Sequence, residues 1–144
     1  MRLKKCVSVC VLGLVLTVPL AAEPAKSFKV IVNPGVAGRA FPRDVLAQIF
    51  LGEVRRWGNG SPISAVDLTS TSPLRQAFSE QVLGMPIDAV KHHWLRKMSG
   101  GQRPPLSKPS DEAVVAFVAA EPGAVGYVSA GTLLPESVRE IAVE

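Results

Sequence analysis

Two patterns of apolar residues alternate along this chain, and each predicts one kind of secondary structure. Short apolar runs bounded by proline, glycine or polar residues predict buried strands. Longer segments with apolar residues three or four positions apart predict helices that bury one face. The predicted strands are 29–33, 63–68, 124–128 and 138–143. The predicted helices are 42–51, 73–83, 86–98 and 111–120.

This alternation predicts an α/β domain with a largely parallel sheet flanked by helices. Right-handed crossovers place the loops that follow parallel strands along one sheet edge, where ligands usually bind. We therefore expect the loops 34–41, 69–73 and 129–134 to lie near one another. Segment 102–109 is expected to be a loop, because its three prolines fix φ and lack backbone donors.

The N-terminal segment has the layout of a secretory signal peptide. Basic residues at positions 2, 4 and 5 precede an apolar stretch that ends near residue 20, followed by two alanines. Cleavage is expected near Ala22, which leaves 23–144 as a single domain in the periplasm or otherwise outside the cell. The alternative is an uncleaved N-terminal anchor, although the apolar stretch is short for a membrane span.

Removal of this segment changes what composition implies. Both cysteines lie within it, so the remaining chain has no disulfide and no thiolate chemistry. Of 16 basic and 12 acidic residues, three basic residues and no acidic residue lie in 1–22. The charges of the remaining chain therefore nearly balance. No basic stripe remains, so a nucleic-acid partner is not expected.

The hydroxyl-rich turn at 69–72 is the main candidate for chemistry. It joins a predicted strand to a predicted helix and contains Thr69, Ser70, Thr71 and Ser72. Ser72 is a favourable N-cap, and proline follows it at the first helical position. A helix start offers unpaired N–H groups and partial positive charge, and Arg75 adds a cation one turn later. These residues are compatible with a simple helix cap and also with a bound anion.

Three segments together resemble the phosphate-binding proteins of ABC transporters, in the type 2 periplasmic binding protein superfamily. The segments are D-V-L-A-Q-I-F-L-G-E-V-R-R-W at 44–57, V-D-L-T-S-T-S-P-L-R-Q-A-F at 66–78 and V-A-A-E-P-G-A-V-G-Y-V at 118–128. The resemblance implies one lobe of the two-lobed fold and non-covalent binding of phosphate or a similar oxyanion. Ser72 and Arg75 would then be ligands, with Thr71, Ser70 and Thr69 as further candidates. A membrane transport or sensory complex would be the partner.

The turn departs from the family pattern in two places. The family has G-S-G-T where this chain has T-S-P-L at 71–74. Pro73 replaces a glycine and removes one N–H, and Leu74 replaces a hydroxyl-bearing residue. An alternative function follows from these departures, namely an envelope interaction or sensory module that has lost the ligand and binds a protein partner.

Catalytic and metal chemistry are not expected. His92 and His93 are neighbours on a predicted helix and point about 100° apart, so they do not form a metal-binding pair. Ser72 has no identifiable base, and no G-x-S-x-G elbow is present. Walker-type and dinucleotide glycine motifs are also missing from the sequence, so no cofactor is expected.

Two aromatic residues have more than one interpretation. Trp57 follows two arginines in a glycine-rich turn and either anchors that loop on the core or contributes to a partner or anion rim. Tyr127 is expected to pack on the last helix with its hydroxyl reaching solvent at the sheet edge, or else to present that hydroxyl to a cleft.

Overall fold

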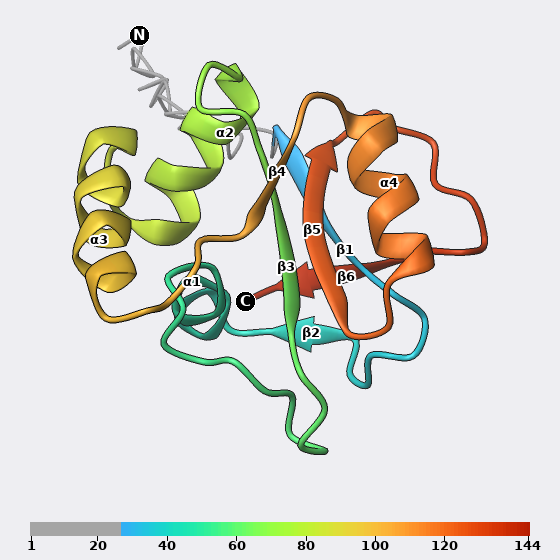
Figure 1. The fold of residues 1–144 in the computed structure, drawn as a ribbon. Helices are drawn as coiled ribbons and strands as arrows, with labels where there is room; N and C mark the ends of the chain where they lie inside the picture. Colours follow the sequence, from blue (N-terminus) through green and yellow to red (C-terminus); the bar gives the residue numbers. More distant parts are fainter. Residues whose placement is uncertain (1–26) are drawn as a thin grey trace, which may run out of the picture.

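A computed structural model describes residues 27–144 of the chain. A six-stranded sheet is flanked by helices, which confirms the predicted α/β class (Figure 1). The elements in chain order are β1 (Phe28–Val32), β2 (Ala40–Phe41), α1 (Arg43–Phe50), β3 (Ser64–Leu68), α2 (Pro73–Phe78), the π-helical turn η1 (Ser79–Leu83), α3 (Ile87–Ser99), β4 (Leu106–Lys108), α4 (Asp111–Ala120), β5 (Ala124–Ser129) and β6 (Arg139–Val143). The predicted signal peptide lies outside the described residues.

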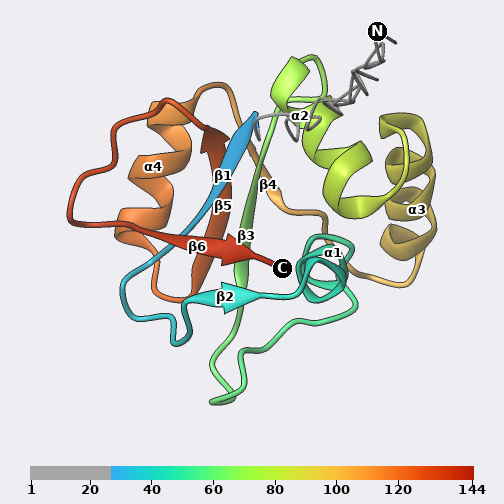
Figure 2. The same ribbon diagram turned by 180° about the vertical axis from the view of Figure 1, so that it is seen from behind.

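The sheet has the strand order β2-β6-β1-β5-β3-β4. β5, β3 and β4 are mutually parallel, and β2 is parallel to β6. Only β1 runs the other way, antiparallel to both β5 and β6. Figure 2 shows β6 and β2 side by side, both directed toward α1. The sheet is therefore largely parallel, with one reversed strand near its centre.

The reversal of β1 corrects the expected grouping of loops. Since Val32 at the end of β1 pairs with Val125 at the start of β5, loop 34–41 lies at the opposite sheet edge from 129–134. Loops 69–73 and 129–134 follow the parallel strands β3 and β5 and share one edge, as expected. The hydrophobic pattern does not encode strand direction, so it could not reveal this reversal.

Helices cover both faces of the sheet. Successive residues of a strand point to opposite faces, and β5 shows this clearly. A Cβ on Gly126 would lie 2.6 Å from Val66 and 2.9 Å from Val114 of α4, so α4 packs closely on this face. On the other face, Tyr127 stacks on Phe78 of α2 with ring centroids 3.8 Å apart. Phe50 of α1 adds an edge contact to both rings.

Three predicted segments differ from the structure in detail. The expected loop 34–41 ends in the short strand β2. The helix predicted at 73–83 is present as α2 followed by η1, and Gly84 ends it with φ 69°. The expected loop 102–109 contains the short edge strand β4, which occupies the three positions between its prolines. Because β4 pairs with β3 on one side only, the prolines before and after it interrupt no further ladder. None of the helices in 27–144 has the length and apolar character needed to cross a bilayer.

Candidate functional site

The hydroxyl turn lies where β3 ends and α2 begins. Ser72 is the N-cap of α2, as predicted, and its Oγ accepts a hydrogen bond from the N–H of Arg75 at 3.4 Å. The Ser72 N–H donates to the carbonyl of Thr69 at 2.9 Å, which closes the turn. Ser70 and Thr71 are exposed, whereas Thr69 and Ser72 are half-buried. The four predicted hydroxyl residues are therefore brought together on one accessible turn.

Several donors of this turn are free. Within residues 27–144, no hydrogen bond takes up the backbone N–H of Ser70, Thr71 or Leu74. Pro73 has no N–H to offer. The Ser72 hydroxyl accepts from Arg75 and keeps its own proton for donation. The turn can thus present backbone and hydroxyl donors to a small acceptor from solvent.

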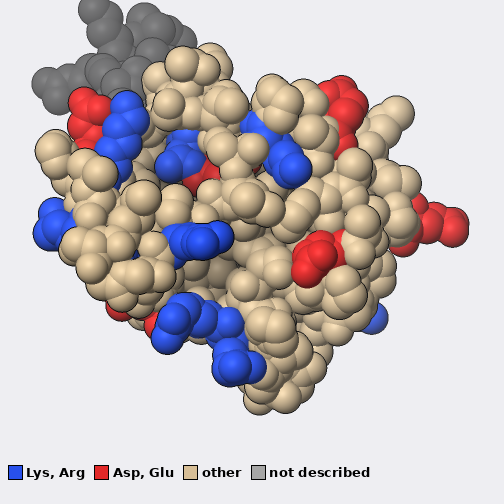
Figure 3. Space-filling model, viewed as in Figure 1, with Lys and Arg blue, Asp and Glu red and all other residues tan. Residues whose placement is uncertain are grey.

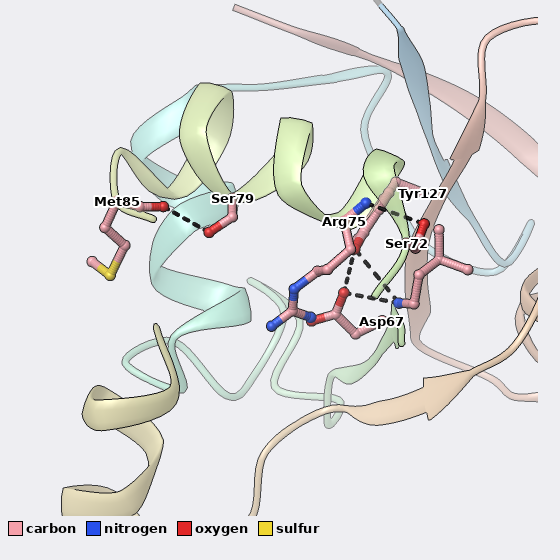
Figure 4. Close-up of polar contacts among 7 residues, drawn as sticks. Asp67, Ser72, Arg75, Ser79, Met85 and Tyr127 are labelled. Atoms are coloured by element: carbon pink, nitrogen blue, oxygen red, sulfur yellow. Dashed lines mark hydrogen bonds and ion pairs between the residues drawn. The ribbon is translucent and has the colours of Figure 1, made fainter. Parts of the chain in front are cut away.

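Arg75 is paired with a residue that the sequence analysis did not single out. Its guanidinium makes an ion pair with Asp67 of β3, and the two side chains are only 12% and 8% exposed. The Tyr127 hydroxyl also donates to Asp67, as does the N–H of Leu68 at 2.9 Å (Figure 4). Arg75 Nε is buried and has no partner within the described residues. The sequence does contain a signal for this network, namely Asp67, a single carboxylate within an apolar strand. A buried carboxylate requires a partner.

The position of Tyr127 corrects one expectation. Its side chain is fully buried, and its hydroxyl bonds to Asp67 instead of reaching solvent. Burial raises the pKa of Tyr127 to about 12, although nearby Arg75 and the Leu68 N–H partly oppose this rise. Burial also lowers the pKa of Arg75. The network therefore keeps the tyrosine protonated as a hydrogen-bond donor over the physiological pH range.

The raised pKa gives a direct prediction. Tyr127 is the only tyrosine, so an alkaline titration of ultraviolet phenolate absorbance reports this group alone. We expect the folded protein to titrate near pH 12, against about 10 for an unfolded chain. Because the folded pKa is the higher one, stability is lost as pH rises from about 10 to 12, by roughly 2–3 kcal/mol. A Tyr127→Phe variant should lose less stability over that interval, and a folded-state midpoint near 10 would contradict the burial of the hydroxyl.

A second helix start at the same sheet edge, that of α4, holds a carboxylate from its own chain. Ser110 caps α4 through a bond from the Ala113 N–H at 3.2 Å. The next residue, Asp111, accepts from the Ser129 N–H at 3.1 Å and from the Thr132 hydroxyl at 2.9 Å. A carboxylate therefore takes the place that an anion would need at this helix start. The turn at 69–72 is the better candidate of the two.

Of the other residues considered from sequence, Trp57 and His93 have structural partners. Trp57 donates from Nε1 to the Gly123 carbonyl at 3.0 Å and packs on Phe41, which matches the interpretation of a loop anchor. His93 Nε2 lies 2.8 Å from the Leu51 carbonyl, and His92 is exposed. No group of three or more potential metal ligands occurs within the part of the chain that the structure describes.

Comparison with solved structures identifies a fold relationship. An ABC-type phosphate transport receptor from Vibrio cholerae matches with TM-score 0.63 and 19% identity, over 81% of this chain and 46% of that one. A phosphate ABC transporter substrate-binding protein from Clostridium perfringens, solved with bound phosphate, matches with TM-score 0.66 and 17% identity, over 81% and 44%. PstS from Borrelia burgdorferi matches with TM-score 0.66 and 15% identity, over 82% and 47%.

These matches confirm the expected resemblance at the level of the fold. The chain spans less than half the length of each of these solved structures. No protein-family model and no curated protein matches the chain.

Proposed function

We propose that this chain, which shares its fold with part of phosphate transport receptors, binds phosphate or a similar oxyanion non-covalently at the 69–72 turn. The observation that carries the proposal is the cluster of free donors there. The N–H groups of Ser70, Thr71 and Leu74 have no partner in the described chain, and the hydroxyl of Ser72 can donate. Backbone donors at a helix start suit an anion because the helix dipole favours negative charge there.

Arg75 balances charge in this proposal. Its pairing with Asp67 compensates a carboxylate that would otherwise repel an anion at the adjacent turn. The site is accessible to solvent on one side, since Ser70 and Thr71 are exposed. Solvent weakens electrostatic contacts, so we expect modest affinity unless another chain covers the turn. The protein would act in the cell envelope after removal of residues 1–22, beside a membrane transport or sensory complex.

A thermal melt of residues 23–144 tests the proposal. Phosphate at about 100 times its Kd stabilises a folded protein by roughly 2.7 kcal/mol, which raises Tm by several degrees. We expect a rise with millimolar phosphate that is larger than the rise with sulfate or chloride at matched ionic strength. The absence of any phosphate-selective rise up to tens of millimolar would contradict the proposal.

Two serine variants distinguish the loss of a phosphate contact from the loss of a helix N-cap. Ser72→Ala and Ser110→Ala each remove an N-cap hydroxyl and should each cost about 1 kcal/mol of stability without ligand. Only Ser72→Ala should reduce the additional rise that phosphate gives. If both variants respond to phosphate like the wild type, Ser72 is a cap and not a ligand.

A further inference from the structure

Three exposed apolar residues line adjoining hollows of the molecule, whereas a fourth, Leu133, lies in the loop between β5 and β6. Four large apolar side chains are highly exposed among the described residues, namely Leu95, Met98, Leu106 and Leu133. The first two line a groove between α3 and the segment that carries β4, together with Trp94. Its volume is about 450 Å³. Clustered exposed apolar side chains rimmed by polar groups are typical of interaction sites.

A second hollow adjoins this α3–β4 groove. It has a volume of about 520 Å³ and shares Trp94, Pro104 and Pro105 with the groove. Leu106, which is 57% exposed, lines this second hollow. The two hollows therefore lie on either side of the Pro104–Pro105 segment and form one elongated surface. Such a shape suits an extended chain better than a compact small molecule.

The edge of β4 supplies unpaired backbone groups to the groove. β4 is the last strand of the sheet, and its Lys108 carbonyl accepts from the N–H of Thr69 in the direction of β3. Because backbone groups alternate in direction along a strand, those of Ser107 point to the opposite side. Ser107 lines the groove, and by this alternation its N–H and carbonyl make no ladder bond to β3. Outside the ladder, no hydrogen bond among residues 27–144 takes them up. An incoming strand could pair with Ser107 alone through both groups, because Pro105 and Pro109 on the same side have no N–H to donate.

Unpaired positive charge lies beside the same surface. Arg55 and Arg103 line the second hollow, both are exposed, and neither makes an ion pair within the described chain. Lys91 lines the groove and makes only a loose, exposed pair with Asp88 at 3.6 Å. One carboxylate, Glu121, lies in the second hollow. Figure 3 shows basic side chains distributed through the middle of this face, with acidic ones fewer and mainly toward its margins.

We propose that the α3–β4 groove binds an extended, acidic segment of a partner protein, which adds as a strand to the open edge of β4. The segment's backbone pairs with Ser107, its apolar side chains contact Leu95, Met98 and Leu106, and its carboxylates face Arg55 and Arg103. Strand addition to an open edge is an established mode of peptide recognition, and pockets beside the edge select the side chains. Complementary charge selects the acidic partner over others.

Fluorescence anisotropy tests this proposal. A labelled heptapeptide of alternating Glu and Leu, with both termini blocked, is titrated with residues 23–144. A peptide with Lys in place of Glu is the charge control. We expect saturable binding of the acidic peptide and at least tenfold weaker binding of the basic one. Arg55→Glu with Arg103→Glu should weaken the acidic peptide at least fivefold and lower its salt dependence. Failure of the acidic peptide to bind, or equal binding of both peptides, overturns the proposal.

Two substitutions at one position test the strand pairing. Ser107→Pro removes the N–H that faces the groove, whereas Ser107→Ala removes the hydroxyl and keeps the N–H. An edge strand tolerates proline where the N–H faces outward, and a melt checks that each variant is folded. We expect about tenfold weaker peptide binding for Ser107→Pro and no change for Ser107→Ala. Should Ser107→Pro unfold, a heptapeptide N-methylated at alternate bonds replaces it, and undiminished binding of that peptide refutes strand addition.

Anionic phosphatidylglycerol vesicles provide the competing outcome. If the protein binds these vesicles through Arg55 and Arg103 but binds neither peptide, the face is a membrane surface and the proposal is wrong. Asp67, Ser70 and Arg75 of the candidate phosphate site also line this groove. Phosphate binding is therefore measured without peptide, so that either result leaves the proposed function to its own test.

Discussion

Arg75→Ala is expected to lower the free energy of unfolding by about 3–5 kcal/mol, because it leaves a buried carboxylate without its cation. Asp67 is only 8% exposed, and its remaining donors are the Tyr127 hydroxyl and the Leu68 N–H. Two neutral donors do not replace a guanidinium in a site with so little solvent. Urea denaturation monitored by circular dichroism measures the loss.

Two further variants test whether the stability loss comes from the unpaired carboxylate of Asp67. Arg96→Ala removes an exposed arginine that makes no ion pair in the described chain, and it should change stability by less than about 0.5 kcal/mol. Asp67→Leu combined with Arg75→Met replaces both charges by apolar groups and should recover much of the lost stability. A loss below 1 kcal/mol for Arg75→Ala would mean that the pair is not buried in solution.

Phe78→Ala is expected to cost about 3–5 kcal/mol through the cavity that it leaves. Phe78 is fully buried, stacks on Tyr127 and makes edge contacts with Phe28 and Phe50. These rings attach α2 to the sheet, so the substitution should also loosen the 69–72 turn at the start of α2. Phosphate should then raise Tm less than it does for the wild type.

Phe117→Ala is the matched control for this cavity. Phe117 is only half-buried, and the ammonium of Lys108 lies 5.4 Å from its ring centroid. Because the Phe117 ring is far less enclosed than the Phe78 ring, Phe117→Ala should lower the free energy of unfolding by clearly less than Phe78→Ala does. Equal losses for the two variants in urea denaturation would contradict the central position of the Phe78 ring. Backbone amide hydrogen exchange in α2 would show whether the turn itself is loosened.

The sequence predicted the local structure around the candidate site because local rules decide it. Ser72 caps α2, and Pro73 takes the first helical position, as the capping preferences require. The hydrophobic periods also located α1, α3, α4, β3 and β5 to within a few residues. These features depend on residues that are close together in the sequence, so a local sequence pattern can predict them.

The features that the sequence could not predict depend on how the elements pack in three dimensions. Asp67 and Arg75 are one strand-to-helix turn apart, but their pairing required knowing that both side chains point into the same buried space. The Tyr127 hydroxyl is expected from sequence to reach solvent at the sheet edge, whereas β5 lies between β1 and β3 and this hydroxyl bonds to buried Asp67. Strand β4 was hidden by flanking prolines that an edge position tolerates.

The central place of β1 has a consequence for how the chain reaches its folded state. The first described strand lies between β5 and β6, and it pairs Phe28 with Ser129 and Val30 with Ile141. Such contacts between the two ends of a chain raise the contact order, and loop-closure entropy then slows folding. The sheet cannot close until the last strand has been synthesised. A growing chain of this kind therefore completes the pairing of β1 only late in synthesis.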